Sequence, residues 1–201
     1  MIKAVIFDMD GVLTDSFYAW YKTINYTSEN FGFGSISEEK FKKTFGQSIE
    51  TDAKELMQGK TAEEVGKAYS EKFPDFITEV RLIDNAKETL NTLNEKGIKL
   101  AIVTNAMRDV TEKILKAKEI RDYFEVIVGG DEVSNAKPDP EPLNKVLELL
   151  NVSKEEAVFI GDTIFDVQAG KSANIFTIGY KINADTKIDD LINIINIIDE
   201  K

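Results

Sequence analysis

Seven polar side chains follow short apolar segments of this sequence and together offer a specific chemistry. They are Asp8, Asp10, Thr104, Asn105, Lys137, Asp162 and Asp166. Carboxylates can act as nucleophiles, as general acids or bases, and as ligands of hard cations such as Mg²⁺. Because a charged group at the end of an apolar strand loses hydration, we expect these residues to have charged partners or a bound ion.

The composition excludes several other chemistries. The 201 residues include no histidine and no cysteine. A Ser-His-Asp triad, a histidine-ligated metal site, a thiolate nucleophile, a zinc finger and a disulfide are therefore excluded. Any metal must be held by oxygen ligands, which favours Mg²⁺ or Ca²⁺.

Charge and hydropathy limit the partners of the chain. Its net charge is −11, from 25 basic and 36 acidic residues, which argues against nonspecific binding of nucleic acid. No apolar stretch approaches the roughly 18 residues that a membrane helix needs. The chain starts with a strand-like segment rather than a signal peptide. We therefore expect a cytoplasmic protein without nucleic-acid or membrane partners.

The elements that must position the seven side chains alternate between strands and helices. The apolar runs predict strands at 3–7, 99–103, 125–128, 157–160 and 175–178, and helical spacing predicts helices at 85–96, 109–117, 140–150, 164–173 and 188–198. This alternation predicts a parallel sheet covered by helices on both faces. In such sheets ligands bind at the carboxyl ends of the strands, which is where the seven side chains fall.

A segment of different character interrupts this pattern after the first strand. Residues 17–76 hold 12 of the 19 aromatic residues, and Phe17, Trp20 and Tyr21 form a stripe with helical spacing. Helices are expected at 17–31, 37–46, 48–57 and 61–73, the last opened by a capping box from Thr61 to Glu64. We therefore predict a doubly wound α/β domain of residues 1–15 and 82–201. A four-helix cap of residues 16–81, with an aromatic core of its own, is inserted into it.

Four motifs resemble those of the haloacid dehalogenase-like (HAD) hydrolase superfamily. They are Asp8-Met-Asp10-Gly11-Val12, Thr104-Asn105, Lys137-Pro138 and Gly161-Asp162-Thr163-x-x-Asp166, in this order along essentially the whole chain. A helical insert between the first two motifs is similar to the subclass that contains phosphoglycolate phosphatase and β-phosphoglucomutase. The resemblance implies a Rossmann-like core with a helical cap and Mg²⁺-dependent phosphoryl transfer.

The resemblance also implies a role for each motif residue in catalysis. Asp8 would be the nucleophile that forms an aspartyl-phosphate, and Asp10 would protonate the leaving oxygen and then activate water. The Thr104 hydroxyl and the Asn105 backbone N–H would hold phosphoryl oxygens. Lys137 would neutralise Asp8 and the transferring group.

A Mg²⁺ ion completes the implied site. Asp8, Asp162 and the backbone carbonyl of Asp10 would bind the ion directly, and Asp166 would hold a metal-bound water or orient Lys137. The ion and the lysine together would offset the carboxylates that otherwise repel a phosphate dianion.

Structural roles remain open for the same residues. The first three motifs also suit turns or surface loops, and Asp162 and Asp166 also suit the N-terminus of the helix that starts at Ile164. The Phe17, Trp20 and Tyr21 stripe suits either the core of the cap or a wall that faces substrate. The candidate residues for recognition of the leaving group are Asp15, Ser16, Gln47, Ser48 and Lys54.

The resulting prediction is a phosphatase for a small phosphate monoester, similar to phosphoglycolate phosphatase. A β-phosphoglucomutase-like mutase is the nearer alternative, although such mutases carry a histidine at the start of the cap, where this chain has Trp20. Dehalogenation needs no acid at the position of Asp10, and a phosphonatase would need a cap lysine such as Lys22 or Lys54. A catalytically silent phosphate-binding protein is the non-enzymatic alternative. A monomer and a homodimer both stay open.

Overall fold

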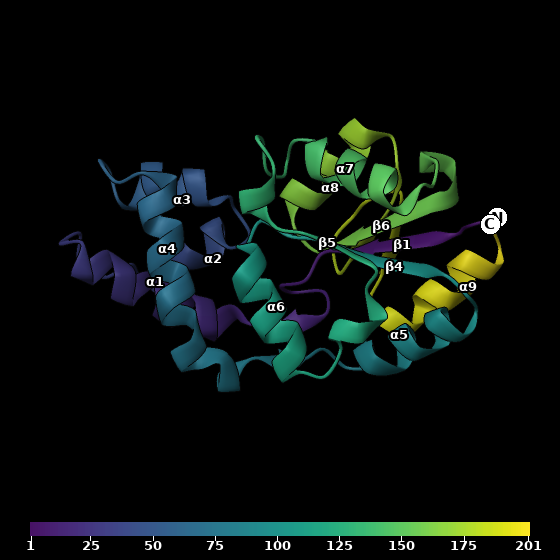
Figure 1. Cartoon of the computed structure of the whole chain (residues 1–201), viewed down its shortest axis with the longest axis horizontal. Helices are drawn as coiled ribbons and strands as arrows, with labels where there is room; N and C mark the ends of the chain where they lie inside the picture. The colour runs from purple at the N-terminus through teal and green to yellow at the C-terminus, as the bar shows by residue number, and fades with distance from the viewer.

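Six short strands form one parallel sheet in the order β5-β4-β1-β6-β7-β8. The computed structural model describes all residues from 1 to 201. The strands are β1 (Ala4–Phe7), β4 (Lys99–Val103), β5 (Val126–Val128), β6 (Ala157–Gly161), β7 (Phe176–Tyr180) and β8 (Thr186–Ile188). Helices lie on both sides of the sheet in Figure 1, which explains why its central strands are apolar throughout. The predicted α/β class with a parallel sheet is confirmed.

The two helical layers bury apolar stripes on opposite faces of the sheet. One layer consists of α5 (Ala86–Glu95), α6 (Arg108–Ala117) and α9 (Ile194–Asp199), and the other of α7 (Glu141–Leu150) and α8 (Ile164–Ala173). Successive residues of β1 alternate between these layers, because side chains of a strand point to alternate faces. Val5 and Phe7 pack in the first cluster, whereas Ala4 and Ile6 pack in the second.

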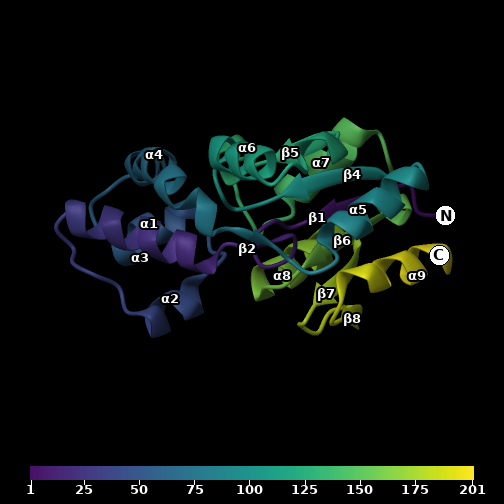
Figure 2. The same cartoon turned by 90° about the horizontal axis from the view of Figure 1, so that it is seen from below.

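The inserted segment contains the four predicted helices. They are α1 (Phe17–Asn30), α2 (Glu38–Thr44), α3 (Ile49–Leu56) and α4 (Ala62–Lys72). Figures 1 and 2 place all four beyond the carboxyl ends of the strands, at the end of the molecule opposite the two termini. The chain enters and leaves the segment through β2 (Thr14–Asp15) and β3 (Arg81–Leu82), which pair antiparallel. The capping box between Thr61 and Glu64 is confirmed.

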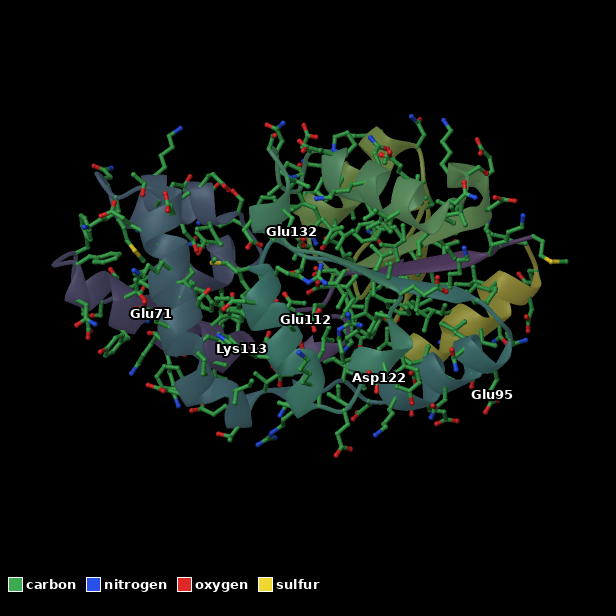
Figure 3. The ribbon with its side chains drawn as sticks, viewed as in Figure 1. Glu71, Glu95, Glu112, Lys113, Asp122 and Glu132 are labelled. Carbon is green, nitrogen blue, oxygen red and sulfur yellow. The ribbon has the colours of Figure 1, made fainter.

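Aromatic side chains hold the inserted helices together. The rings of Phe17 and Phe41 lie 4.8 Å apart between centroids, and those of Trp20 and Phe73 lie 4.5 Å apart. These residues belong to one apolar cluster that continues into the α5 side of the sheet, so the segment does not have the separate core that we expected. On the outside, Lys113 of α6 donates to the carbonyl oxygen of Ser70 in α4 at 3.3 Å (Figure 3).

The sequence-based prediction is wrong at three places. The helix expected from 188 begins only at Ile194, because Ile188 is the buried last residue of β8. Strand β8 and the pair β2 and β3 have two or three residues each, which is too short for a recognisable hydrophobic period. Five 3₁₀ turns complete the chain: Phe73–Glu79, Arg121–Tyr123, Gly130–Glu132, Lys154–Glu156 and Leu191–Asn193.

None of the helices combines the length and apolarity required to cross a bilayer.

Candidate active site

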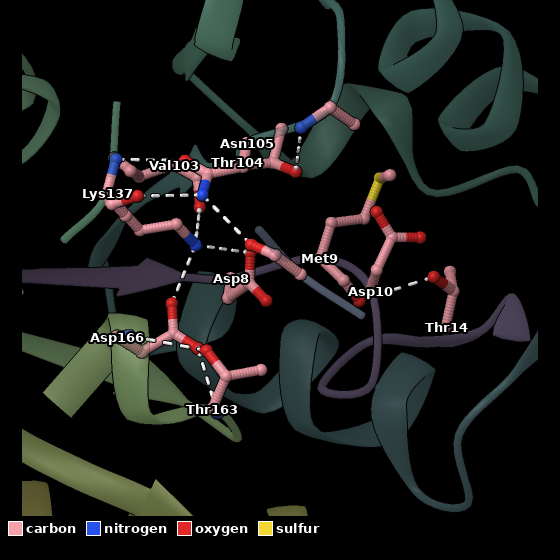
Figure 4. Close-up of polar contacts among 12 residues, drawn as sticks. Asp8, Met9, Asp10, Thr14, Val103, Thr104, Asn105, Lys137, Thr163 and Asp166 are labelled. Atoms are coloured by element: carbon pink, nitrogen blue, oxygen red, sulfur yellow. Dashed lines mark hydrogen bonds and ion pairs between the residues drawn. The ribbon is translucent and has the colours of Figure 1, made fainter. Parts of the chain in front are cut away.

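The carboxyl ends of β1, β4 and β6 bring the predicted residues to one edge of the sheet. Asp8 follows β1 directly, Thr104 follows β4, and Asp162 follows β6, while Lys137 arrives on the long loop after β5. Figure 4 shows this meeting of separate segments, with the lysine between two carboxylates. Asp8 and Lys137 are only 5% and 3% exposed, so their charges must be compensated within the protein.

Lys137 is shared by two carboxylates. Its Nζ donates to Oδ1 of Asp8 at 2.7 Å, to Oδ1 of Asp166 at 2.6 Å and to the carbonyl oxygen of Val103 at 3.2 Å. These three acceptors use all three ammonium protons. The lysine is therefore fixed in position beside Asp8 and has no proton left for a further partner.

The carboxylates outnumber the cations at this edge. Ligand atoms of Asp8, Asp162 and Asp166 lie within 4.8 Å of one another, whereas Lys137 is the one ammonium beside them. Oδ1 of Asp162 is buried and has no hydrogen-bond partner. Three clustered carboxylates with an unpartnered oxygen are the donor set that a hard divalent cation takes, so the residues fit Mg²⁺.

The proton affinities of the cluster reflect the same deficit of positive charge. Burial raises the pKa of Asp8 to about 7, although Lys137 opposes the shift. Burial, together with the charges of Asp8 and Asp166, raises the pKa of Asp162 to about 8. Burial lowers the pKa of Lys137, but attraction to the two carboxylates outweighs it and raises this pKa above its usual range. A bound cation would relieve the repulsion and return the carboxyls to their charged forms.

Two glycines leave the space in which the carboxylates sit. Gly11 has a φ of +92°, and a Cβ built on it would collide with the carboxylate of Asp162. A Cβ on Gly161 would likewise collide with Asp166. Glycine is therefore required at these positions of the first and last motifs, because a larger residue would collide with the carboxylate cluster.

Asp166 combines two of the roles considered from the sequence. Its Oδ2 accepts from the backbone N–H of Thr163 at 3.0 Å, while the Thr163 hydroxyl accepts from the Asp166 N–H, so the pair forms a capping box at the start of α8. Its Oδ1 holds Lys137. Capping by one oxygen thus orients the other toward the lysine.

Asp10 lies beside Asp8 in sequence but has different partners. Its Oδ1 accepts hydrogen bonds from the hydroxyl of Ser16 and from Nε1 of Trp20, the latter at 3.1 Å. Burial raises the pKa of Asp10, and these two donors reduce the shift. A carboxyl with a raised pKa can carry a proton near neutral pH, as a general acid must.

Thr104 and Asn105 lie on the opposite side of Asp8 from α8. The Thr104 hydroxyl accepts from the Ala106 N–H at 3.1 Å, which leaves its own proton for another acceptor. The Asn105 amide donates to the carbonyl oxygens of Lys137 and Gly46, both at 2.9 Å, and so joins the inserted segment to the sheet. The backbone N–H of Asn105 has no acceptor within the protein.

A cavity of about 50 Å³ separates this edge from the inserted segment. Asp8, Asp10 and Lys137 line its floor, while Trp20, Gln47 and Asp52 belong to its opposite wall. Trp20 therefore fits both interpretations of the aromatic stripe, because it packs on Phe73 and also faces the cavity.

Only some of the residues expected to recognise the leaving group lie near the cavity. Gln47 lines the cavity and Ser16 holds Asp10, whereas Ser48 caps α3, and Asp15 and Lys54 are exposed. Lys22 pairs with Glu79 at 2.7 Å, and neither Lys22 nor Lys54 lines the cavity, where a phosphonatase would need its lysine. Asp52 and Tyr69 line the cavity but were not among the sequence candidates.

Comparison with known proteins gives a consistent result. Residues 5–180 match the model of the family described as haloacid dehalogenase-like hydrolase. The pyrophosphatase PpaX of Halalkalibacterium halodurans is 32% identical over 92% of this chain and 86% of its own length. The phosphoglycolate phosphatase of Aquifex aeolicus is 30% identical over 88% of this chain and 83% of its own. A HAD-superfamily hydrolase of subfamily IA from Geobacter sulfurreducens has a TM-score of 0.74 at 28% identity, over 98% of this chain and 96% of that one.

Proposed function

Because this chain belongs to the haloacid dehalogenase-like hydrolase family, we propose that it hydrolyses a small phosphate monoester through an aspartyl-phosphate on Asp8, with Mg²⁺ as cofactor. The observation that carries the proposal is the shared ammonium of Lys137, 2.7 Å from Asp8 and 2.6 Å from Asp166. A buried carboxylate held beside one fixed cation, with room for a second, is equipped to attack an anionic phosphoryl group.

Asp8 and Asp10 would divide the first half of the reaction. A carboxylate oxygen of Asp8 attacks phosphorus, and the bond between phosphorus and the ester oxygen breaks. The proton held by Asp10 passes to the departing oxygen, so that an alcohol leaves. The Thr104 hydroxyl and the free N–H of Asn105 would donate to the phosphoryl oxygens while charge develops on them.

The second half reverses the role of Asp10. Its carboxylate takes a proton from a water molecule, and the water oxygen attacks phosphorus. The bond between phosphorus and the Asp8 oxygen breaks, which releases inorganic phosphate and restores both carboxyls. Lys137 stays paired with Asp8 throughout and stabilises the negative charge that returns to it.

The divalent cation supplies positive charge that neutralises the phosphoryl oxygens and the carboxylate cluster. Asp8, Asp162 and the backbone carbonyl of Asp10 would hold it, with Asp166 supporting the site through Lys137 or a bound water. This assignment is supported by the clustering of Asp8, Asp162 and Asp166 and by the unpartnered Oδ1 of Asp162.

Residues 16–81 would act as the cap of this site, and residues 1–15 and 82–201 as its catalytic core. The boundaries coincide with β2 and β3, where the chain passes twice between the two parts. This role is supported by the position of the inserted helices along one wall of the cavity and by the hydrogen bond from Asn105 to Gly46. Closure of this kind excludes water from the reacting phosphoryl group.

Hydrolysis is preferred over the alternatives for reasons in the cap. The related mutases carry a histidine at the start of the cap, whereas this chain has Trp20 there, which donates to Asp10. A silent binding protein has no need for Asp10 and Asp162 in addition to Asp8.

The curated relatives do not define the substrate, since one is named for pyrophosphate and another for phosphoglycolate.

The proposal is tested by release of phosphate from p-nitrophenyl phosphate. We expect turnover with Mg²⁺, loss of turnover in excess chelator, and loss in Asp8→Asn. The matched control is Asp122→Asn, which makes the same change at an exposed site, labelled in Figure 3. Full activity in chelator or in Asp8→Asn would refute the proposal, as would the absence of turnover by the folded, Mg²⁺-loaded protein.

A further inference from the structure

The cap wall of the cavity carries no positive charge. The acidic and basic side chains around the cavity are Asp8, Asp10, Lys137 and Asp52. The ammonium of Lys137 is already occupied by Asp8 and Asp166. A second negative group on a substrate would therefore find no counterion in the wall that faces the leaving group.

Asp52 is an unusual residue for its position in the cap. It lies on α3 among Ile49, Ala53 and Leu56, on the buried face of that helix, and is 6% exposed. Its Oδ1 accepts from Nε2 of Gln47 at 2.7 Å, and its Oδ2 accepts from the hydroxyl of Tyr69 at 3.0 Å. A carboxylate accepts up to about four hydrogen bonds, so both oxygens keep capacity for a further donor.

Packing alone does not explain this carboxylate. Burying a carboxylate without a cationic partner is costly, and no lysine or arginine pairs with Asp52. Burial raises its pKa to about 7, although the hydrogen bonds from Gln47 and Tyr69 oppose the shift. A neutral side chain would satisfy Gln47 and Tyr69 at lower cost, so the carboxylate has a use beyond holding them.

The surroundings of Asp52 connect it to the reaction. Tyr69, which donates to Asp52, packs against Trp20 with ring centroids 5.9 Å apart, and Trp20 donates to Asp10. One continuous wall thus runs from the proposed acid to Asp52. Ile24, Phe41 and Ile49 line the same cavity and offer apolar contact to a short carbon skeleton.

We propose that Asp52 recognises the leaving group of the substrate and selects phosphate esters whose alcohol carries a hydrogen-bond donor and no negative charge. This inference rests on the proposed phosphatase function and deepens it. The donor is a hydroxyl or an ammonium, from which Asp52 in the cavity wall can accept. The expected class is the phosphate ester of a small polyol or amino alcohol, and phosphoglycolate and pyrophosphate are poor substrates.

The wild-type protein tests this selection directly with four substrates and Mg²⁺. Glycerol 2-phosphate offers a hydroxyl and phosphoethanolamine an ammonium, whereas phosphoglycolate and pyrophosphate offer a second negative charge. We expect kcat/KM to be at least about tenfold higher for one of the first two than for either of the anionic pair. The better of the first two identifies the donor. Equal or higher values for phosphoglycolate or pyrophosphate would overturn the inference.

Asp52→Asn isolates the charge. We expect it to reduce the preference for donor-bearing over anionic substrates at least about tenfold, and the control Glu55→Gln, an exposed site on the same helix, to leave the preference unchanged. Thr44→Lys tests the same argument without removing Asp52, because it adds a cation to the cavity wall and should raise kcat/KM for phosphoglycolate. An unchanged preference in Asp52→Asn, or in Thr44→Lys if Asp52→Asn does not fold, would overturn the inference.

Turnover of p-nitrophenyl phosphate distinguishes failure of the phosphatase proposal from failure of the proposed role of Asp52. Its leaving group carries neither an ammonium nor a second anionic group. No phosphate release from it or from any of the four other substrates would refute the phosphatase proposal itself. Turnover of this ester combined with a preference for anionic leaving groups would refute only the role of Asp52.

Discussion

The ammonium of Lys137 lies 2.7 Å from Oδ1 of Asp8, in a position where both side chains are almost completely buried. The same ammonium also holds Asp166 at 2.6 Å. A buried charge that loses its partner is strongly destabilising, and here two carboxylates depend on one lysine. The proposed nucleophile is therefore positioned by an interaction that also stabilises the fold.

Replacement of Lys137 should affect both properties. Lys137→Ala leaves Asp8 and Asp166 without their cation, so we expect turnover of p-nitrophenyl phosphate to fall at least about 100-fold. We also expect the free energy of unfolding without metal to fall by about 3–5 kcal/mol. Steady-state kinetics and urea unfolding measure the two effects. Lys154→Ala, at an exposed position, should change neither, and an active, equally stable Lys137→Ala would contradict the account.

Gly11 offers a test of the carboxylate cluster with a closely matched control. Gly11 and Gly59 have φ values of +92° and +94°, so an alanine at either site has a similar backbone strain of about 1–2 kcal/mol. Only at Gly11 would the new Cβ collide with the carboxylate of Asp162, because no atom lies within 4 Å of a Cβ at Gly59. Gly11→Ala should therefore weaken Mg²⁺ activation at least about tenfold, measured as the Mg²⁺ concentration for half-maximal rate, while Gly59→Ala keeps it. The same metal dependence in both variants would argue against a role for Asp162 at the metal.

The edge of the sheet could be predicted from the sequence because each motif follows a strand. Asp8, Thr104 and Asp162 come after apolar runs of four or five residues, and parallel strands end at a common edge. The position of Lys137 was less predictable, since a loop brings it to Asp8 from 129 residues away in sequence. Spacing alone contains no information about which two carboxylates that lysine contacts.

The cap wall was harder to predict. Asp52 lies three residues after Ile49 and four before Leu56, so a search for polar residues within apolar helical stripes would have found it. The hydrogen bond from Trp20 to Asp10 depends on how α1 sits above β1, which helical periodicity does not define. The contact of Tyr69 with Asp52 joins two different helices, and helical periodicity does not define such a contact.

The indole of Trp20 should tune the acid–base behaviour of Asp10. Trp20→Phe keeps a ring beside Phe73 but removes the donor to Oδ1 of Asp10. Because that donor favours the charged carboxylate, its loss should raise the pKa of Asp10 further. We expect the limb of the pH–rate profile that reports Asp10 to move up by about one pH unit. A profile that stays in place would show that the indole has no such effect.

Asp52 should make stability depend on pH. Burial raises its pKa to about 7 in the folded protein, against 3.8 as its ordinary value. Between these values the folded state binds more protons than the unfolded state, so the contribution of Asp52 to stability falls as pH rises from about 4 to about 7 and then levels off. Glu50 and Glu55 act in the same direction, while Gln47 and Tyr69 oppose it.

The variant Asp52→Asn isolates this contribution from the other carboxyls. Its Tm relative to wild type should increase as pH is raised from 5 to 8, because only the wild type has to ionise the buried carboxyl. Differential scanning calorimetry of both proteins without metal measures the difference. A Tm difference that is constant with pH, or that changes in the opposite direction, would show that Asp52 titrates normally.

The covalent step on Asp8 is tested most directly by trapping the phosphorylated protein. The Mg²⁺-loaded enzyme is quenched in acid during turnover of p-nitrophenyl phosphate, digested and analysed by mass spectrometry. We predict a phosphoryl group on the carboxyl of Asp8, with none on the same peptide from Asp8→Asn. Turnover without any phosphorylated Asp8 across the range of quench times, or a phosphoryl group on another residue, would contradict the account.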